Sequence, residues 1–220
     1  DKKKFNSYYE VYIKQISYLL NILGININTV PVLDVRRKFT NKVIGNRSFS
    51  SNPSLVSKIG KTCIKKFHEN HIGTIIKHIP GHGLSKDDSH LRLPIIKNNL
   101  KTLNKVDFFP FKNQDTLIAM TAHVIYRSVD PKNPATHSKK IMKLIRKKIS
   151  FKNIIISDDI SMKALKYSIS ENTTRAFSAG CNLVLHCNGK ISEMYKVAKN
   201  SPKIDRFLMK KTLEFYKLIS

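Results

Sequence analysis

Residues 73–90 read GTIIKHIPGHGLSKDDSH, and this stretch joins a strand signal to a long polar loop. The run 73–79 is rich in β-branched residues and predicts a buried strand. Pro80, Gly81 and Gly83 then break the regular backbone. A loop hinged by glycines at the end of a strand can close over a bound molecule. The stretch therefore predicts a strand whose C-terminal end carries a functional loop.

Short β-rich runs alternate with amphipathic segments along the whole chain. Further strands are expected at 25–33, 117–126, 153–157 and 182–187, and helices at 5–23, 53–70, 138–149, 173–179 and from 191 onward. This alternation implies right-handed βαβ units and a parallel sheet. Polar residues follow four of the strands: Asp34, Lys77 with His78, His123, and Asp158. Such gathering is typical of the active face of a (β/α) barrel, and also of a doubly wound sheet.

Length and composition favour one domain over residues 1–220. The 41% hydrophobic content is enough for a sizeable core. No apolar run is long enough for a membrane-spanning helix, and the charged N-terminus has no secretory signal. The chain begins without Met, so we expect a fragment or a processed product. Cys63, Cys181 and Cys187 have no zinc-type spacing, and unpaired thiols fit a reducing cytoplasm.

The chain is strongly basic, with 40 Lys and Arg against 15 Asp and Glu and a net charge of +25. One interpretation is a nucleic-acid binder whose cations neutralise phosphates. The other is a lysine-biased surface, and we favour it because the lysines are scattered and no nucleic-acid-binding motif accompanies them. We therefore expect no nucleic-acid partner. In either case, the field attracts anionic ligands.

Asp88 and His90 form a candidate dyad in the polar loop. They lie two residues apart, so their side chains share a side if the loop is extended. A carboxylate bonded to an imidazole fixes its tautomer, which suits a general acid/base near neutral pH. A histidine in a polar loop is, however, more often a plain surface residue.

Asp158 and Asp159 follow the predicted strand 153–157. One of them could cap a helix N-terminus. A carboxylate at a strand's C-terminal end, facing a pocket, is also a candidate nucleophile. Helix capping accounts easily for one carboxylate and less easily for both.

Together these segments resemble the family 3 glycoside hydrolases, and within them the cytoplasmic bacterial β-N-acetylhexosaminidases of muropeptide recycling. The matching stretches run in family order over almost the whole chain, at 31–34, 44–49, 77–94, 122–126, 151–162 and 179–182. The Lys-His-x-Pro-Gly-His-Gly…Asp-Ser-His arrangement is highly specific to the N-acetylglucosaminidase branch. The resemblance implies a (β/α)8 TIM-type barrel that acts as a single catalytic domain. No His/Cys/Asp cluster in the sequence suggests a metal, and no Gly-rich loop has phosphate-binding context, so we expect neither metal nor cofactor.

The resemblance also implies a retaining, two-step hydrolysis of terminal β-linked N-acetylglucosamine. Asp158 would be the nucleophile, and His90, oriented by Asp88, the acid/base. Arg47, Lys77 and His78 would hold the sugar. The implied substrates are muropeptides or chitooligosaccharides, and we expect a monomer. A neutral histidine does not repel phosphate, so phosphorolysis stays open as a variant reaction.

The same resemblance assigns supporting roles to other polar residues. Asp34 would support the barrel face, and Asp159 would cap a helix. His82 and His123 would form loop or pocket wall. The family's first two strand-helix units, with an Asp-Gln-Glu-Gly-Gly-Arg stretch, have no match here, so we expect an N-terminally truncated barrel. A hypothesis of another class is a non-catalytic basic protein that binds nucleic acid or anionic wall fragments.

Overall fold

The computed structural model describes residues 2–87, 89 and 91–220. The helices are α1 (Lys2–Ile22), α2 (Pro53–His68), α3 (Leu100–Lys105), α4 (Lys139–Leu144), α5 (Ile169–Ala179), α6 (Ile191–Asn200) and α7 (Arg206–Ile219). The strands are β1 (Ile27–Asn28), β2 (Gly73–Ile79), β3 (Ile95–Ile96), β4 (Ile118–Thr121), β5 (Ile125–Tyr126), β6 (Ile154–Asp159) and β7 (Leu183–Leu185). Short 3-10 helices occupy Gly45–Arg47, Phe109–Phe111 and Ala135–His137, and a π-helical turn at Ile145–Ile149 continues α4.

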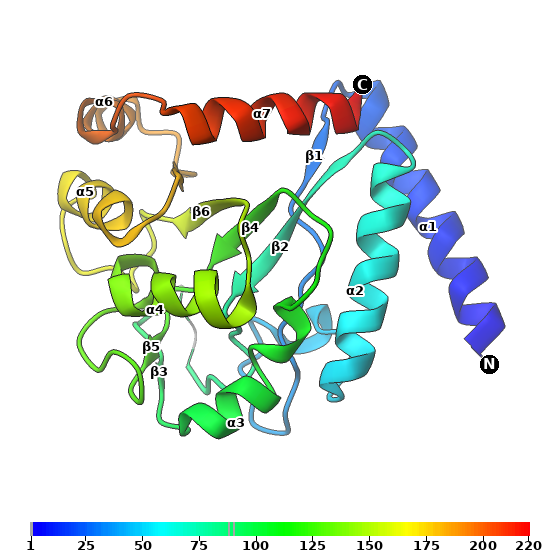
Figure 1. Ribbon diagram of the computed structural model, residues 1–220, viewed down its shortest axis with the longest axis horizontal. Helices are drawn as coiled ribbons and strands as arrows, with labels where there is room; N and C mark the ends of the chain where they lie inside the picture. Colours follow the sequence, from blue (N-terminus) through cyan, green and yellow to red (C-terminus); the bar gives the residue numbers. More distant parts are fainter. Residues whose placement is uncertain (1, 88, 90) are drawn as a thin grey trace.

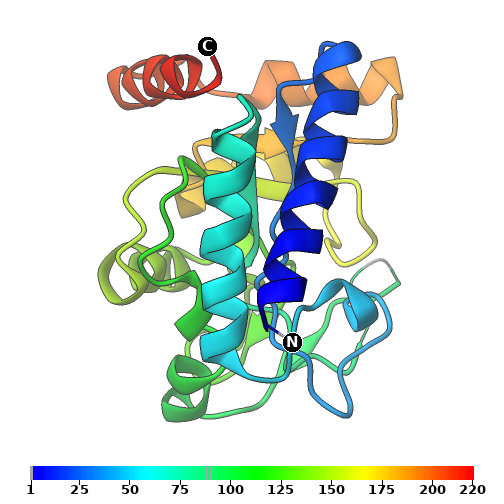
Figure 2. The same cartoon turned by 90° about the vertical axis from the view of Figure 1, so that its right-hand side faces the viewer.

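The main sheet is parallel and has the strand order β1-β2-β4-β6-β7. β3 and β5 form a separate parallel pair. Figures 1 and 2 show α1 and α2 side by side, and Figure 1 shows α5 and α6 at the opposite end of the sheet. The predicted alternation of strands and helices is confirmed. Because all strands of the main sheet run the same way, their C-terminal ends meet at one edge.

Alternating residues of the strands build two hydrophobic layers. Ile76, Ala119 and Ile155 belong to the layer between the sheet and its helices. Ile75, Ile118 and Ile154 lie in register on the opposite face. This follows from the two-residue period of a strand, which sends successive side chains to opposite faces.

Helix α7 packs on the face formed by Ile75, Ile118 and Ile154, near the N-terminal ends of the strands, and lies above the main sheet in Figure 1. Leu208 and Phe215 are its buried residues. A Cβ built on Gly73 would lie 2.2 Å from Cζ of Phe215. Gly73 therefore makes room for the aromatic ring where α7 meets β2.

Several predicted segments have different bounds in the structure. The strand expected at 25–33 is regular only at Ile27–Asn28, because Pro31 has no N–H to donate, and Val32 makes only an isolated bridge to Lys77. The strand expected at 117–126 is two strands in the structure, β4 and β5. β4 belongs to the main sheet, whereas β5 pairs with β3 through Ile125 and Tyr126. Within the described residues, none of the helices combines the length and hydropathy needed to cross a bilayer.

Phe215 tests the docking of α7. Phe215 is 7% exposed, whereas its neighbour Tyr216 is 59% exposed. We expect Phe215→Ala to lower the free energy of unfolding by about 3 kcal/mol, because it leaves a cavity beside Gly73. Tyr216→Ala, the matched control, should cost no more than about 0.5 kcal/mol. Urea denaturation followed by circular dichroism measures both, and equal losses would contradict the packing role of Phe215.

Candidate active site

A cavity of about 330 Å³ lies at the C-terminal edge of the main sheet. We call it the Asp158 cavity. Its polar lining residues are Thr29, Arg47, Lys77, His78, His82, Ser89, Asp158 and Cys187. They come from the segments around β1, β2, β6 and β7. The structure thus brings four of the predicted site residues, Arg47, Lys77, His78 and Asp158, to one cavity.

Irregular pairing at two strand ends shapes this cavity. The register between β2 and β4 shifts between Lys77 and Ile79, and that between β6 and β7 shifts between Ile156 and Asp159. Successive residues of a regular strand point to opposite faces, yet Lys77 and His78 both line the cavity. Such irregularities re-aim side chains near functional sites. Here they allow two neighbouring residues of one strand to face the same space.

His78 lies between two carboxylates. Its Nδ1 is 2.7 Å from Oδ2 of Asp34, and its Nε2 is 3.9 Å from Oδ2 of Asp158. The contact with Asp34 fixes the plane of the ring. His78 therefore presents its second nitrogen toward Asp158.

Asp34 holds the start of the polar loop through hydrogen bonds between its carboxylate and the loop backbone. Its carboxylate is 0% exposed and also accepts hydrogen bonds from the backbone N–H groups of His78 (3.3 Å) and His82 (2.7 Å). Burial opposes ionisation, but the His78 and His82 contacts outweigh it and hold the pKa of Asp34 below its usual range. Asp34 is therefore ionised at neutral pH and supports the barrel face, as the sequence predicted.

Gly81 and Gly83 are packed tightly in the same loop. A Cβ on Gly83 would lie 2.1 Å from the backbone oxygen of Val35, and one on Gly81 would lie 2.6 Å from Cβ of Asp107. The Tyr126 hydroxyl donates to the Gly81 carbonyl. Their role in this structure is close approach of backbone segments, rather than the hinge predicted from the sequence.

Asp158 projects from the end of β6 into the cavity. Its Oδ1 accepts a hydrogen bond of 2.8 Å from the Asp159 N–H. Burial raises the pKa of Asp158, but the His78 and His123 imidazoles and this N–H outweigh it, so the pKa lies below its usual range. An ionised carboxylate in a recess is the form that a nucleophile requires.

Two cations face the same space. Nζ of Lys77 is 3.0 Å from Oγ1 of Thr29, and burial, followed by the nearby Arg47, lowers the pKa of Lys77. Arg47 is exposed and donates to the Val43 carbonyl at 3.0 Å. Both side chains keep donors that a bound sugar could use. Their predicted role in substrate binding stays a prediction.

His123 ties β4 to the Asp158 segment. It is 0% exposed, with Nδ1 2.7 Å from Oγ1 of Thr136 and Nε2 2.9 Å from the Asp159 carbonyl oxygen. Burial lowers the pKa of His123. Because a carbonyl oxygen can only accept, Nε2 of His123 is the donor to Asp159. The sequence predicted a pocket wall, and the structure instead shows an internal tie beneath Asp158.

His82 lines the Asp158 cavity, as predicted. Neither ring nitrogen finds a partner among the residues that the structure describes. Burial lowers the pKa of the His82 imidazole to about 4. A neutral ring in this position can donate or accept one hydrogen bond.

The family model described as "Glycosyl hydrolase family 3 N terminal domain" matches residues 10–211. This chain belongs to family 3 of the glycoside hydrolases. The beta-hexosaminidase of Nitrosomonas eutropha is 35% identical over 185 residues, which are 80% of this chain and 53% of that protein. The beta-hexosaminidase of Neisseria meningitidis serogroup C is 38% identical over 176 residues, which are 77% and 48% of the two chains. The family 3 chain thus spans about half the length of these curated relatives.

Solved structures give the same family. NagZ from Neisseria gonorrhoeae, in complex with N-trifluoroacetyl-D-glucosamine, superposes with a TM-score of 0.82 and 30% identity over 97% of this chain and 65% of that one. A family 3 beta-N-acetylglucosaminidase from Paenibacillus sp. str. FPU-7 gives 0.83 and 27% over 96% and 42%. The predicted TIM-type fold is confirmed, and the curled parallel sheet of the family 3 chain is part of such a barrel.

The predicted Asp88–His90 dyad lies outside the described residues. Of the neighbouring residues in this loop, Ser89 lines the Asp158 cavity, and Arg92 forms an ion pair with Asp87. The acid/base role of His90 and the orienting role of Asp88 therefore stay predictions for the family 3 chain.

The prediction that Asp159 caps a helix is wrong. Its carboxylate accepts from the Ser161 N–H (3.0 Å) and hydroxyl, and from the Cys187 N–H at 3.2 Å. The next helix, α5, begins later and is capped by Ser168. Asp159 therefore links the β6 loop to the end of β7. The spacing of Asp159 and Ser161 is typical of a local side-chain turn, and this signal was open to sequence analysis.

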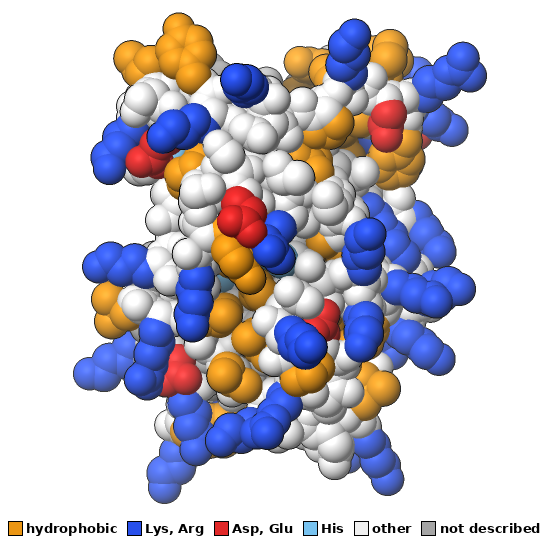
Figure 3. Space-filling model, turned by 90° about the vertical axis from the view of Figure 1, so that its left-hand side faces the viewer, with side chains coloured by type: hydrophobic (Ala, Val, Ile, Leu, Met, Phe, Trp, Pro, Cys, Tyr) orange, Lys and Arg blue, Asp and Glu red, His pale blue; other side chains and the backbone are white. Residues whose placement is uncertain are grey.

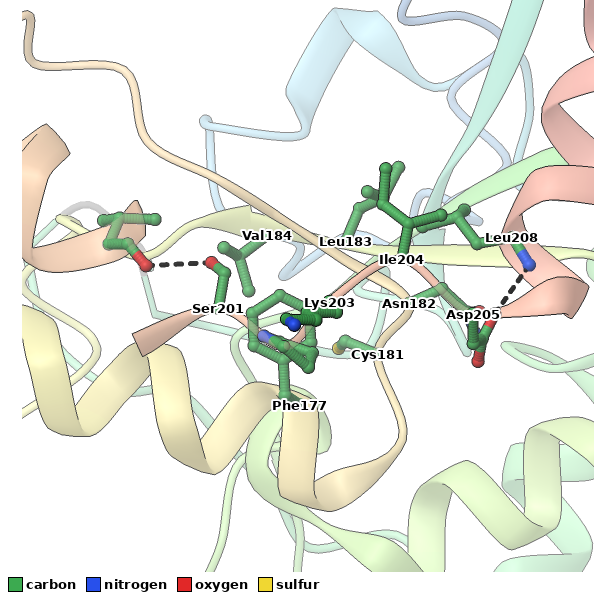
Figure 4. Close-up of a pocket in the computed structure, with 12 residues that line it drawn as sticks. Phe177, Cys181, Asn182, Leu183, Val184, Ser201, Lys203, Ile204, Asp205 and Leu208 are labelled. Carbon is green, nitrogen blue, oxygen red and sulfur yellow. Dashed lines mark hydrogen bonds between the residues drawn. The ribbon is translucent and has the colours of Figure 1, made fainter. Parts of the chain in front are cut away.

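Another hollow, of about 420 Å³, lies between α5, β7 and the segment leading into α7 (Figure 4). Its walls are mostly apolar, with Phe177, Cys181 and Ile204 among them. Its one carboxylate, Asp205, already caps α7 by accepting from the Leu208 N–H at 2.7 Å. The hollow thus offers none of the paired polar groups seen in the Asp158 cavity.

Asp34 provides a test of the site's support. We expect Asp34→Asn to lower the free energy of unfolding at pH 7 by about 2–4 kcal/mol, because it weakens three buried hydrogen bonds. The folded pKa of Asp34 is lowered, so this stabilisation is complete above the unfolded pKa of about 3.9 and is lost as the pH falls through the folded value.

The difference between wild type and Asp34→Asn should therefore narrow below about pH 4, as measured by urea denaturation at several pH values. Asp115→Asn, at an exposed position, is the control and should change stability by less than about 0.5 kcal/mol. A difference that widens on acidification would contradict the assigned charge of Asp34.

Proposed function

We propose that this family 3 chain takes part in the hydrolysis of terminal β-linked N-acetylglucosamine, with Asp158 as the nucleophile. The observation that carries the proposal is the ionised Asp158 carboxylate in a recess beside His78 and Lys77. The curated relatives are named beta-hexosaminidase, and one similar structure is a beta-N-acetylglucosaminidase. Both the carboxylate in the recess and the names of the relatives support cleavage of a glycosidic bond.

The reaction has two displacements. An Asp158 oxygen attacks the anomeric carbon, and the bond to the leaving oxygen breaks as His90 supplies a proton. Water then attacks the same carbon, His90 takes the water's proton, and the Asp158 ester bond breaks. His90 is carried by the loop in which Ser89 faces the Asp158 cavity, and Asp88 would orient its imidazole. Two inversions give net retention.

Arg47, Lys77 and His78 would hold the sugar. The two cations donate to hydroxyl oxygens, and the second nitrogen of His78 can donate or accept. The cavity volume of about 330 Å³ lies at the small end of ligand pockets. This size favours one sugar unit beside Asp158 and supports action at a chain terminus.

The proposed substrates are muropeptides or chitooligosaccharides that end in N-acetylglucosamine. We propose a monomer. We also propose a cytoplasmic location, in keeping with the free thiols of Cys63, Cys181 and Cys187. Phosphate could replace water as the acceptor. A reaction run in phosphate buffer and analysed for N-acetylglucosamine 1-phosphate would reveal such phosphorolysis.

The basic surface is the basis for the alternative, a polyanion-binding protein. Figure 3 shows Lys and Arg side chains spread over one face, interrupted by uncharged and hydrophobic side chains. Specific phosphate recognition uses cations clustered along a face or groove. The scattered arrangement favours the hydrolase.

Asp158→Asn tests the nucleophile. We expect it to lower kcat/KM for p-nitrophenyl β-N-acetylglucosaminide by at least about 10⁴-fold, since an amide cannot replace the carboxylate in the displacement. A fluorinated N-acetylglucosaminide that slows the second displacement should add one sugar to wild-type protein on the peptide containing Asp158, seen by mass spectrometry.

Asp115→Asn, at an exposed position, is the matched control and should keep wild-type activity and labelling. An active Asp158→Asn variant, or label on another peptide, would remove Asp158 from the nucleophile role. Wild-type protein without turnover or label, but with salt-sensitive binding to polyanions, would favour the binding protein instead.

A further inference from the structure

Asp107 is a buried carboxyl group that the proposed reaction does not use. It lies between α3 and the 3-10 helix Phe109–Phe111, next to the core residue Phe108. Asp107 is 0% exposed, and neither of its side-chain oxygens has a hydrogen-bond partner among the described residues. An ionised carboxylate without donors is much more costly to bury than a neutral carboxylic acid. The surroundings of Asp107 therefore favour the protonated form.

Asp107 packs directly against the loop that follows β2. A Cβ on Gly81 would lie 2.6 Å from Cβ of Asp107 and 2.7 Å from the Asp107 backbone oxygen. The Gly81 N–H donates to the His78 carbonyl at 2.7 Å, and the Tyr126 hydroxyl donates to the Gly81 carbonyl. Gly81 therefore connects Asp107 to the backbone of His78, whose ring faces Asp158.

Asp34 and Asp107 both contact the 78–82 segment, but they differ in their hydrogen bonds. Asp34 accepts from three donors, whereas the Asp107 side chain makes no such bond within the described part of the chain. The pKa of Asp34 is lowered, whereas burial, followed by the Asp34 charge, raises the pKa of Asp107 well above its usual range. Opposite shifts of two neighbouring carboxyl groups assign them different roles, because both cannot ionise at low cost.

The other groups that face Asp107 do not reverse this shift. The Arg37 guanidinium and the Leu84 N–H favour ionisation of Asp107, but the N–H does not reach hydrogen-bond geometry. The Tyr126 hydroxyl is neutral, because burial, followed by the two carboxyl groups, raises its pKa. Of the three acidic groups that meet here, Asp34 is therefore the one that carries a charge at neutral pH.

We propose that Asp107 is a positioning residue of the active site and acts as a neutral carboxylic acid. Packed against Gly81, it holds the 78–82 segment in the conformation in which His78 faces Asp158. A charged Asp107 would repel Asp34 and weaken the hydrogen bonds that hold this segment. The assignment rests on the proposed hydrolase function, since it concerns the placement of His78 at the Asp158 cavity.

The unfolding equilibrium tests the neutral state of Asp107 and needs no turnover. Below the unfolded pKa of about 3.9, Asp107 is neutral in both states. Above it, the unfolded chain loses a proton that the folded chain keeps, so each pH unit favours unfolding by up to about tenfold. Asp107→Asn has no such proton. We expect the ratio of the wild-type to the Asp107→Asn unfolding constant to rise more than about tenfold between pH 5 and 7, measured by urea denaturation.

A ratio that stays constant or falls as the pH rises would overturn the proposal, because the folded protein would then hold Asp107 ionised. Asp115→Asn, at an exposed position, is the matched control. Its ratio to wild type should change by less than about twofold over the same range, because an exposed side chain meets water in both states.

Cleavage of p-nitrophenyl β-N-acetylglucosaminide tests the positioning role. Asp107→Ala removes the side chain that packs beside Gly81. It should lower kcat/KM at pH 7 by at least about tenfold, because small displacements of positioned groups lower the rate steeply. Asp107→Asn keeps the size and the neutrality of the acid and should restore most of the loss. Wild-type activity in Asp107→Ala, or equal losses in both variants, would contradict the positioning role.

Trypsin cleavage separates this proposal from the hydrolase function. Lys86 is exposed in the polar loop, and Lys163 is exposed in the segment after β6. We expect Asp107→Ala to speed cleavage after Lys86 by at least about fivefold and after Lys163 by less than about twofold, because the change is local. Asp107→Asn should leave both rates unchanged.

If none of the proteins cleaves the glycoside but this proteolysis pattern and the pH-dependent ratio are observed, the role of Asp107 stands and the hydrolase proposal fails. If the glycoside is cleaved but both trypsin sites are accelerated equally, or neither is, the positioning role is wrong. The comparison of wild type with Asp107→Asn decides the charge state even where Asp107→Ala does not fold.

Discussion

The buried Asp34 carboxylate is the interaction on which the site depends. Three donors converge on it, the His78 ring and the N–H groups of His78 and His82. A buried charge of this kind is stable only when its hydrogen bonds are complete. The requirement works in both directions: Asp34 positions the His78 ring toward Asp158, and it fixes the backbone where the polar loop leaves β2.

The segment that carries Asp158 and Asp159 is also held by hydrogen bonds to residues distant in the chain. His123 reaches the Asp159 carbonyl from β4, and the Asp159 side chain reaches Ser161 and the Cys187 N–H. Each tie crosses between neighbouring strands or loops. Asp158 is therefore placed by polar contacts of its neighbours, while its own charge is stabilised by His78, His123 and the Asp159 N–H. Rigid support of this kind holds a reacting group in productive geometry.

Particular residues show why some predictions succeeded. Strand β2 could be predicted because its isoleucines are followed by polar residues. The family motif identified Arg47, Lys77, His78 and Asp158 from the sequence alone. The misassigned residues were those whose partners are distant in the chain. Asp159 bonds Cys187, 28 residues away, and His123 bonds Asp159, 36 residues away. Neither contact leaves a local pattern, so capping and pocket-wall roles were the default interpretations.

By itself, the sequence determined the alternation of strands and helices, the family, and the identity of the residues at the strand ends. Local propensity and side-chain periodicity are sufficient for these features. Only the tertiary structure decided that Lys77 and His78 share one cavity, that Gly81 and Gly83 are packed against other backbone, and that the Asp107 carboxyl group is buried. These outcomes depend on strand register and on contacts between segments far apart in the chain, which burial and hydrogen bonding select together.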